Sequence, residues 1–246
     1  MSNSSFELRN TRLEDIDPII DLCAAVYPGM YSWGPNQLTS HLEVFPEGQF
    51  VVVQKVPSPA SGLVTDRVIG MASSLIVDYS NHDLRSKWKD ITEWGYLGNH
   101  APERGRTLYG VEIMVHPEFQ GKGVGKLLYQ RRELLARERR MLNIRAGARI
   151  SGYHRYAQKM SAREYVVAVI RGEFSDPTLS FQLKRGFRVI GLTPYYFHDP
   201  ESLNHAAVIE WLNPEVATEA DHASGDLEFL DAAKAAALPL RPRSPE

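Results

Sequence analysis

The stretch Leu108-Tyr-Gly-Val-Glu-Ile-Met-Val115, followed by the turn Gln120-Gly-Lys-Gly-Val-Gly125, decides the fold of this chain. Its first half is short, apolar and rich in β-branched residues, which predicts a buried strand. His116 and Pro117 end that strand. After the glycines, leucines recur in pairs that form one face of a helix: Leu127, Leu128, Leu134 and Leu135. The sequence therefore predicts a strand, a glycine loop and a helix in succession.

The glycine loop predicts a phosphate site. Gly121, Gly123 and Gly125 permit positive φ angles, so backbone N–H groups can turn toward one point. The helix that follows begins with unpaired N–H groups and the positive end of its dipole, a combination that binds phosphate. Lys122 and Lys126 add positive charge at the same place.

The spacing of the glycines distinguishes between phosphate-binding motifs. The Walker pattern fails, because Gln120 stands where its first glycine belongs and Leu127 where Ser or Thr is required. The dinucleotide pattern fails as well, since the third glycine comes one residue too early. The pattern Gln/Arg-x-x-Gly-x-Gly/Ala fits at Gln120, Gly123 and Gly125. This pattern resembles the acetyl-coenzyme A signature of the GNAT acyltransferase superfamily.

The resemblance implies a cofactor and the residues that hold it. Acetyl-CoA would be bound by the loop and by the backbone of the strand before it, where Met114 and Val115 hold the pantetheine arm and polarise the thioester. The residues so implied are Met114, Val115, Gln120, Gly121, Lys122, Gly123, Val124, Gly125 and Lys126.

The order of predicted elements is also that of the superfamily. Strands are expected at 6–10, 49–55, 67–77, 108–115, 143–149, 187–197 and 205–212, with helices at 11–26, 35–44, 124–142, 161–171 and 176–186. The resemblance implies an α/β (α+β) fold with a mixed, mainly antiparallel central sheet and helices on both faces. Blocks such as Tyr31-Ser-Trp33 and Gly152-Tyr-His-Arg-Tyr156 resemble the acetyltransferase module that some bacterial proteins fuse to a nitrilase-type carbon–nitrogen hydrolase.

We predict one domain over residues 1–214, with an insertion at 78–106 and a C-terminal tail at 215–246. The insertion contains a short helix at 83–93 and is either a functional lid or a packed decoration. The tail is rich in Ala, Pro, Glu and Asp, and residues 226–238 predict one short amphipathic helix. We expect the tail to be loosely attached or to mediate a self-contact, which would make a homodimer.

Composition excludes several classes of protein. The 246-residue chain carries a net charge of −2, and the arginines at 131, 132, 137, 139 and 140 are interpreted as a solvated helix face, so no nucleic-acid partner is expected. No apolar run reaches the length of a membrane span, and no signal peptide is evident. Cys23 is the only cysteine, which indicates a reducing compartment, the cytoplasm. Eight histidines without paired metal-ligand spacing predict no metal site.

Glu112 is the first candidate catalytic residue, because it is a carboxylate inside an otherwise apolar strand. Burial of a carboxylate is costly unless it has a partner or a task. Acetyl transfer from a thioester needs a base, since a lysine-like amine has a pKa of about 10.4. Glu112 is therefore either a general base or a structural carboxylate paired with an arginine such as Arg149.

The proton donor is harder to assign. Many GNAT enzymes carry a tyrosine four residues before the glycine of a Lys-x-Gly-Phe pattern, and that position here is Gln182. An amide does not supply a proton at neutral pH. Tyr153, His154 and Tyr156 follow the strand end that should border the thioester, so they are candidate substitutes. The alternative is that this cluster is a structural loop.

The function that the resemblance implies is N-acetyl transfer from acetyl-CoA to an amine, carried by a small molecule or a peptide. Two other classes stay open. One is a non-catalytic acyl-CoA sensor or docking module, and the other is hydrolysis of an acyl-CoA thioester. Release of free thiol with and without amines separates the three.

Overall fold

A computed structural model describes residues 6–30, 32–57, 63–80 and 82–237. The chain divides into two compact units. Unit 1 comprises Met1–Tyr79 and Lys89–Ile144, and unit 2 comprises Ser80–Trp88 and Arg145–Glu246.

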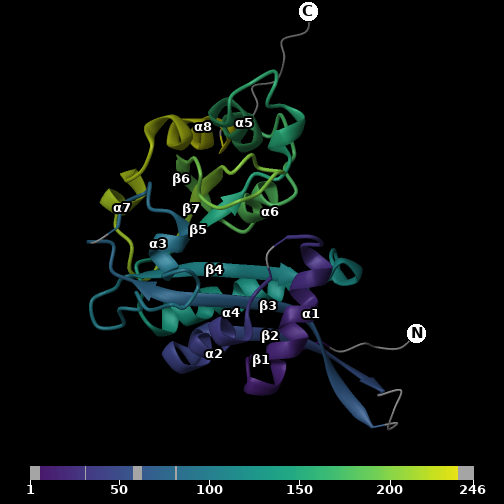
Figure 1. Ribbon diagram of the computed structural model, residues 1–246. Helices are drawn as coiled ribbons and strands as arrows, with labels where there is room; N and C mark the ends of the chain where they lie inside the picture. The colour runs from purple at the N-terminus through teal and green to yellow at the C-terminus, as the bar shows by residue number, and fades with distance from the viewer. Residues whose placement is uncertain (1–5, 31, 58–62, 81, 238–246) are drawn as a thin grey trace, which may run out of the picture. The chain divides into compact units, whose positions relative to one another are not determined.

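Unit 1 is built on an antiparallel sheet of four strands in the order β1-β2-β3-β4 (Figure 1). The strands are β1 (Phe6–Asn10), β2 (Gln49–Pro57), β3 (Val64–Val77) and β4 (Thr107–Val115). Ten consecutive residues of β3 are buried, from Val68 to Val77, which is typical of a strand covered on both faces.

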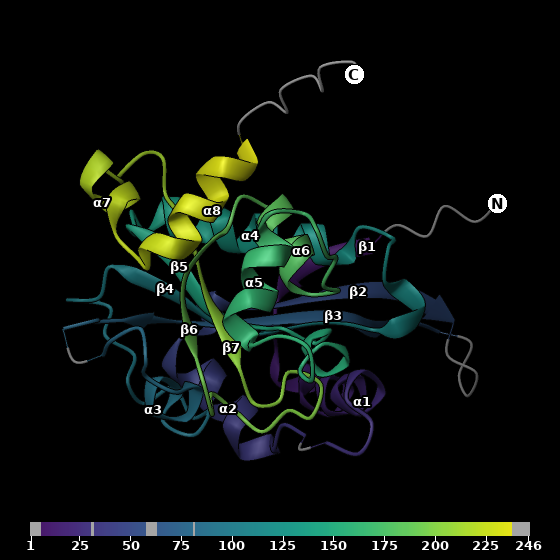
Figure 2. The ribbon, with the colours of Figure 1, turned by 90° about the horizontal axis from the view of Figure 1, so that it is seen from above.

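Helices cover both faces of this sheet. Helices α1 (Ile16–Val26) and α2 (Pro35–Val44) lie on one side and α4 (Val124–Glu138) on the other, as Figures 1 and 2 both show. Gly70 in β3 lets α4 approach closely, because a Cβ there would lie 2.7 Å from Val124 Cγ1 and 3.2 Å from Leu128 Cδ1. The predicted fold class, a mainly antiparallel sheet with helices on both faces, is confirmed.

Unit 2 contains the strands β5, β7 and β6 as neighbours in that order. They are β5 (Asn143–Arg149), β6 (Arg188–Thr193) and β7 (Ala206–Leu212). The unit also contains α5 (Ala162–Ile170) and α6 (Leu179–Lys184), which contact each other. Helix α5 begins with a capping box, in which Glu164 Oε2 accepts from the Ser161 amide at 2.7 Å. A buried ion pair holds the strands, because Glu210 accepts from Arg145 at 2.9 Å and from Arg188 at 2.6 Å.

The tail helix is packed within unit 2, so the expectation of loose attachment is wrong. It forms α8 (Leu227–Ala237) after a short α7 (Glu219–Ala223), while Leu238 lies outside the described residues. Phe229 is fully buried, and Arg163 on α5 binds both Asp226 and Glu228, at 2.9 and 2.8 Å. The tail is rich in alanine and acidic residues, and that composition gave no sign that the Phe229 side chain would be buried. The boundary predicted at residue 214 stays a prediction.

The part of the insertion in unit 1 packs against α2, and its role as a lid or a decoration stays a prediction. Its helix α3 spans only Trp88–Thr92, shorter than predicted, and Ile91 and Leu97 are buried. Three side chains of α2 bind the backbone carbonyls of residues 94–96: Gln37 binds Trp94 O, His41 binds Gly95 O and Ser40 binds Tyr96 O, at 2.7, 2.8 and 2.6 Å.

Among the element ends that differ from the sequence prediction, two have a left-handed residue nearby. The main helix was expected to reach Leu142, but α4 ends at Glu138 and Arg140 has φ +50°. The strand expected to reach Phe197 ends at Thr193, and Tyr195 has φ +54°. Both conformations are unfavourable for residues with a Cβ and leave no regular element through these positions.

Candidate active site

The glycine loop has the backbone conformation that a phosphate site requires. Gly121 has φ +74° and Gly123, the N-cap residue of α4, has φ +90°. No atom of the described residues lies within 4 Å of where a Cβ would stand at either glycine. The positive φ, and not crowding, therefore demands glycine here, and the space in front of the loop is open to a ligand. Residues 121–123 are exposed, as is Lys126.

An aromatic anchor holds the loop at the end of β4. Phe119 is buried. The guanidinium carbon of Arg67 lies 5.3 Å from the centroid of its ring, and Lys122 Nζ lies 5.1 Å from the same centroid. The Phe119 ring also packs edge-on against Phe6 and His116. Gln120 donates from its amide to Val115 O at 3.4 Å, which ties the loop back to the strand. His116 is a turn residue, as expected: its Nδ1 accepts from the Glu118 amide.

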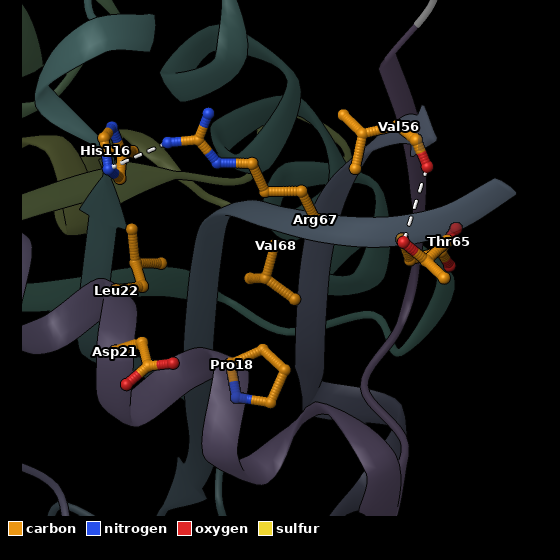
Figure 3. Close-up of a pocket in the computed structure, with 9 residues that line it drawn as sticks. Pro18, Asp21, Leu22, Val56, Thr65, Arg67, Val68 and His116 are labelled. Carbon is orange, nitrogen blue, oxygen red and sulfur yellow. Dashed lines mark hydrogen bonds between the residues drawn. The ribbon is translucent and has the colours of Figure 1, made fainter. Parts of the chain in front are cut away.

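A pocket of about 390 Å³ lies on the α1 side of the hairpin, with His116 at its rim (Figure 3). It is lined by Pro18, Asp21, Leu22, Val56, Thr65, Asp66, Arg67, Val68 and His116. Two charged side chains of the pocket already form ion pairs. Arg67 binds Glu118 at 2.9 Å and also contacts His116, and Asp66 binds Lys55 and Arg9. The Arg67–His116 contact, drawn in Figure 3, links β3 to the strand end from which the glycine loop starts.

A β-bulge interrupts the β3–β4 ladder at the centre of the site. Ser73 pairs with Glu112 and Ser74 pairs with Gly110, so Val111 is the extra residue. The guanidinium of Arg132, on α4, fills the gap: Nη2 donates to Ser73 O at 3.0 Å and to Glu112 O at 2.7 Å, and Nε donates to Ser74 Oγ at 3.0 Å. Arg132 is 2% exposed, and burial lowers its pKa. The sequence reading of this arginine as part of a solvated face is wrong.

We expect Arg132→Met to destabilise the protein by about 2–4 kcal/mol. The substitution removes the donors to two buried carbonyls and one hydroxyl, and buried acceptors without donors are costly. Thermal or urea unfolding measures the loss. Arg131→Met is the matched control: Arg131 binds Glu138 near the surface and should change stability by less than about 1 kcal/mol. Equal losses in the two variants would show that the bulge does not depend on Arg132.

The side chain of Glu112 is half-buried on the α1 face of the sheet. Its Oε1 accepts from the Tyr27 hydroxyl at 3.2 Å and from the Ile113 amide at 2.9 Å. Arg149, the arginine named as its alternative partner, donates to Asp199 at 2.8 Å and to Glu201 at 3.1 Å. These two donors fix the orientation of the carboxylate. Such an orientation is compatible both with a general base and with a structural carboxylate.

A buried chain of hydrogen bonds lies beside Glu112. Ser73, its partner across the ladder, is fully buried with Oγ 3.3 Å from His41 Nδ1. His41 Nε2 lies 2.8 Å from Gly95 O; because a carbonyl only accepts, Nε2 carries the proton and Nδ1 accepts from Ser73. Burial lowers the pKa of His41 to about 4. His41 is therefore neutral at neutral pH and fixes β3 against the inserted segment.

This histidine predicts a pH dependence of stability. The folded pKa of about 4 lies below the unfolded value of 6.5, so the unfolded state binds more protons between these pH values. His41 should thus cost no stability above pH 6.5 and about 3 kcal/mol once the pH has fallen to 4. Urea unfolding from pH 7 to 4.5 should show a shallower loss in His41→Gln, which retains a donor for Gly95 O. Parallel curves for parent and variant would contradict the prediction.

One amide at the end of β4 points away from β3. His116 N donates to Ile69 O on β3 at 2.9 Å. Because successive N–H groups along a strand point to opposite edges, the Val115 N–H points away from β3. The Ile113 N–H, which points the same way, is taken by Glu112 Oε1. Met114, on the side-chain face of Glu112, is buried.

The second set of candidates, Tyr153, His154 and Tyr156, lies in unit 2 and forms a stacked loop. The Tyr153 ring is buried between Tyr165 and His205, with its hydroxyl 3.4 Å from Met160 O. His154 is exposed, with Nδ1 3.0 Å from Ser151 O and 3.1 Å from Glu201 O. Tyr156 stacks on Tyr165 and Phe174. The loop is internally bonded, and its catalytic role stays a prediction.

The residue that replaces the superfamily tyrosine, Gln182, is buried in α6 at 5% exposure. Below it, Asp176 binds the amides of Thr178 and Leu179 at the start of that helix, as well as the Tyr165 hydroxyl at 2.9 Å. Sequence reasoning missed Tyr27, Ser73, His41 and Arg132 as neighbours of Glu112. The available signal was polarity within an apolar strand, which marks Ser73 but not Tyr27, His41 or Arg132.

Among the described residues, no group of three or more His, Cys, Asp or Glu side chains could hold a metal ion. In the same part of the chain, no helix is long and apolar enough to cross a membrane.

Comparison with known proteins defines the class. Residues 26–160 match the acetyltransferase (GNAT) family model. Over 210 residues the chain is 34% identical to the uncharacterised N-acetyltransferase YkwB of Bacillus subtilis, covering 84% of this chain and 88% of that protein. It is 42% identical over 207 residues to the probable hydrolase YhcX of the same organism, covering 84% of this chain but only 38% of YhcX. The chain thus spans well under half the length of that relative.

Solved structures show the same fold. The loading GNATL domain of CurA from Lyngbya majuscula superposes with a TM-score of 0.69 at 18% identity, covering 86% of this chain and 99% of that one. The GNAT-like decarboxylase GphF, in complex with isobutyryl-CoA, gives 0.67 at 20% identity, covering 84% and 99%. The chain belongs to the GNAT acetyltransferase family, whose fold binds acyl-CoA and carries acyl transfer.

Proposed function

We propose that this protein transfers an acetyl group from acetyl-CoA to the amino group of a small molecule or peptide. The observation that carries the proposal is the loop of Gly121 and Gly123, with positive φ at the start of α4, directly after the strand that bears Glu112. Family membership supports acyl transfer from CoA. We further propose a cytoplasmic location, an amine as the partner rather than nucleic acid or membrane, and a homodimer.

The loop fits the pyrophosphate of CoA. An anion in front of Gly121 and Gly123 would meet exposed backbone, because no atom of the described chain fills that space. The N–H groups of the first turn of α4, from Val124 to Lys126, face outward from the helix end and carry the positive end of its dipole. Lys122 and Lys126 would neutralise the remaining charge. Gln120 and the Val115 carbonyl, bonded to each other, would form the wall beside the pantetheine arm.

Glu112 would remove the proton from the acceptor ammonium, directly or through a water molecule. The Val115 N–H, which points away from β3, would donate to the oxygen of the thioester as negative charge develops there. The Arg132 guanidinium would hold the backbone of Glu112 at the bulge, so that base and donor keep their spacing along β4.

Release of free CoA thiol, followed with and without a panel of amines and polyamines, tests this function. Thiol release that depends on an amine, with N-acetylated product by mass spectrometry, supports it. Thiol release without an amine would indicate a thioesterase. Binding of CoA without thiol release would indicate a sensor or docking module. Loss of carbon dioxide from a carboxyacyl-CoA, with no transfer, would indicate a decarboxylase, the activity for which GphF is named.

A further inference from the structure

The hydroxyl of Tyr27 is hydrogen-bonded to the carboxylate of Glu112, the candidate general base. Tyr27 caps the C-terminus of α1, where its amide donates to Cys23 O at 2.8 Å. Helix α1 packs on β3 and β4, so the phenol is carried to the face of β4 on which Glu112 lies. The Tyr27 hydroxyl donates to Glu112 Oε1 at 3.2 Å. Both side chains are half-buried, so neither is sealed from a substrate.

The proposed reaction needs a proton on the departing thiolate. The proton that Glu112 takes from the ammonium is the same proton that the thiolate lacks when the carbon–sulfur bond breaks. Gln182, at the position where many family members carry a tyrosine, has only an amide, and an amide does not supply a proton. A phenol does so, with a pKa of about 10 against about 8.5 for a thiol.

The placement along β4 brings Tyr27 near the region where the thioester is expected. Glu112 precedes Met114 and Val115 by two and three residues, which is about 7–10 Å along a strand. The Tyr27 hydroxyl, which reaches Glu112 from the end of α1, therefore lies beside the stretch of β4 that precedes the expected path of the pantetheine arm. Tyr153 and His154, by contrast, are bonded to carbonyls of their own unit.

We propose that Tyr27 is the proton carrier between Glu112 and the leaving thiolate. This inference rests on the proposed function. The amine nitrogen, once deprotonated by Glu112, attacks the thioester carbon; the carbon–sulfur bond breaks and its electron pair goes to sulfur. Tyr27 gives its proton to sulfur and regains one from the protonated Glu112. From an ammonium acceptor two protons leave nitrogen: the first is carried through Glu112 and Tyr27 to sulfur, and the second passes from the tetrahedral intermediate to water as the amide forms.

Tyr27→Phe tests the assignment, because it keeps the ring and removes only the hydroxyl. We expect kcat with acetyl-CoA and the best amine to fall about 10²-fold, the scale of a lost general acid. The basic limb of the pH–rate profile should disappear, while CoA affinity and melting temperature stay near the parent values. Tyr195→Phe is the matched control: Tyr195 is 73% exposed in unit 2, and loss of its hydroxyl should leave both limbs in place.

The outcomes separate the two proposals. A parent enzyme that turns over amines, with a Tyr27→Phe variant that keeps the full profile, overturns the role of Tyr27 and leaves the transferase function intact. A variant that loses rate equally at every pH shows that Tyr27 only orients Glu112, which also overturns it. A parent without turnover of any amine overturns the transferase function and the role of Tyr27 with it.

Discussion

Replacement of Glu112 by glutamine is expected to lower kcat by about 10²–10⁴-fold, the usual scale for a lost acid–base group. Glutamine has nearly the same shape, and its carbonyl oxygen can still accept from the Tyr27 hydroxyl and the Ile113 amide, which bind Oε1 in the parent. The fold and the CoA site should thus be kept while the basicity is lost. Steady-state kinetics with acetyl-CoA and the best amine, together with CoA affinity, measure both effects.

The control for this substitution is Glu138→Gln. Glu138 ends α4 and binds only the nearby Arg131 among the ion pairs described, at 3.0 Å. Removing its charge should leave kcat within about twofold, because exposed ion pairs contribute little. A Glu112→Gln enzyme as active as the parent would contradict a basic role and favour the structural reading of this carboxylate.

The glycine loop could be predicted from sequence because its chemistry is local. Gly121 and Gly123 take positive φ angles that other residues avoid, and the strand before them and the helix after them have clear periodicity. Glu112 could be singled out for a related reason: it is the one charge in an apolar strand. Each of these signals lies within a few consecutive residues.

The surroundings of Glu112 could not be predicted, because they depend on contacts between distant segments. Tyr27 stands 85 residues before Glu112, in a stretch whose Tyr, Pro and Gly residues predict a loop. Arg132 lies among five arginines of one helical run, and only its position over the bulge at Val111 distinguishes it from its exposed neighbours. A bulge leaves no mark in hydrophobic alternation, so its need for a buried guanidinium is invisible until the strands are paired.

The tail shows the same limit. Its composition favours a loose segment, yet Phe229 is fully buried and Arg188 binds the carbonyls at the end of α7, including Asp221 O at 2.7 Å. Phe229 and two arginines from other elements, Arg163 and Arg188, decide its attachment, and none of them stands out in composition.

Replacement of Gly123 by glutamate should abolish CoA binding. At φ +90° any residue with a Cβ is strained, and the carboxylate would stand where the pyrophosphate is expected. Losing the charge-assisted N–H contacts and adding repulsion should weaken CoA affinity by at least about 10²-fold.

Gly172→Glu is the matched control for this substitution. Gly172 follows α5 with φ +75°, and no described atom stands within 4 Å of its missing Cβ. Glutamate there carries the same backbone strain and the same charge far from the loop in sequence. It should lower stability to a similar degree and leave CoA affinity unchanged.

Isothermal titration calorimetry of CoA into the parent, Gly123→Glu and Gly172→Glu proteins tests whether the loop at the start of α4 is the CoA site. We expect saturable binding to the parent and to Gly172→Glu, and no measurable binding to Gly123→Glu. Parent protein that does not bind CoA at millimolar concentration, or a Gly123→Glu variant with the parent affinity, would contradict that assignment.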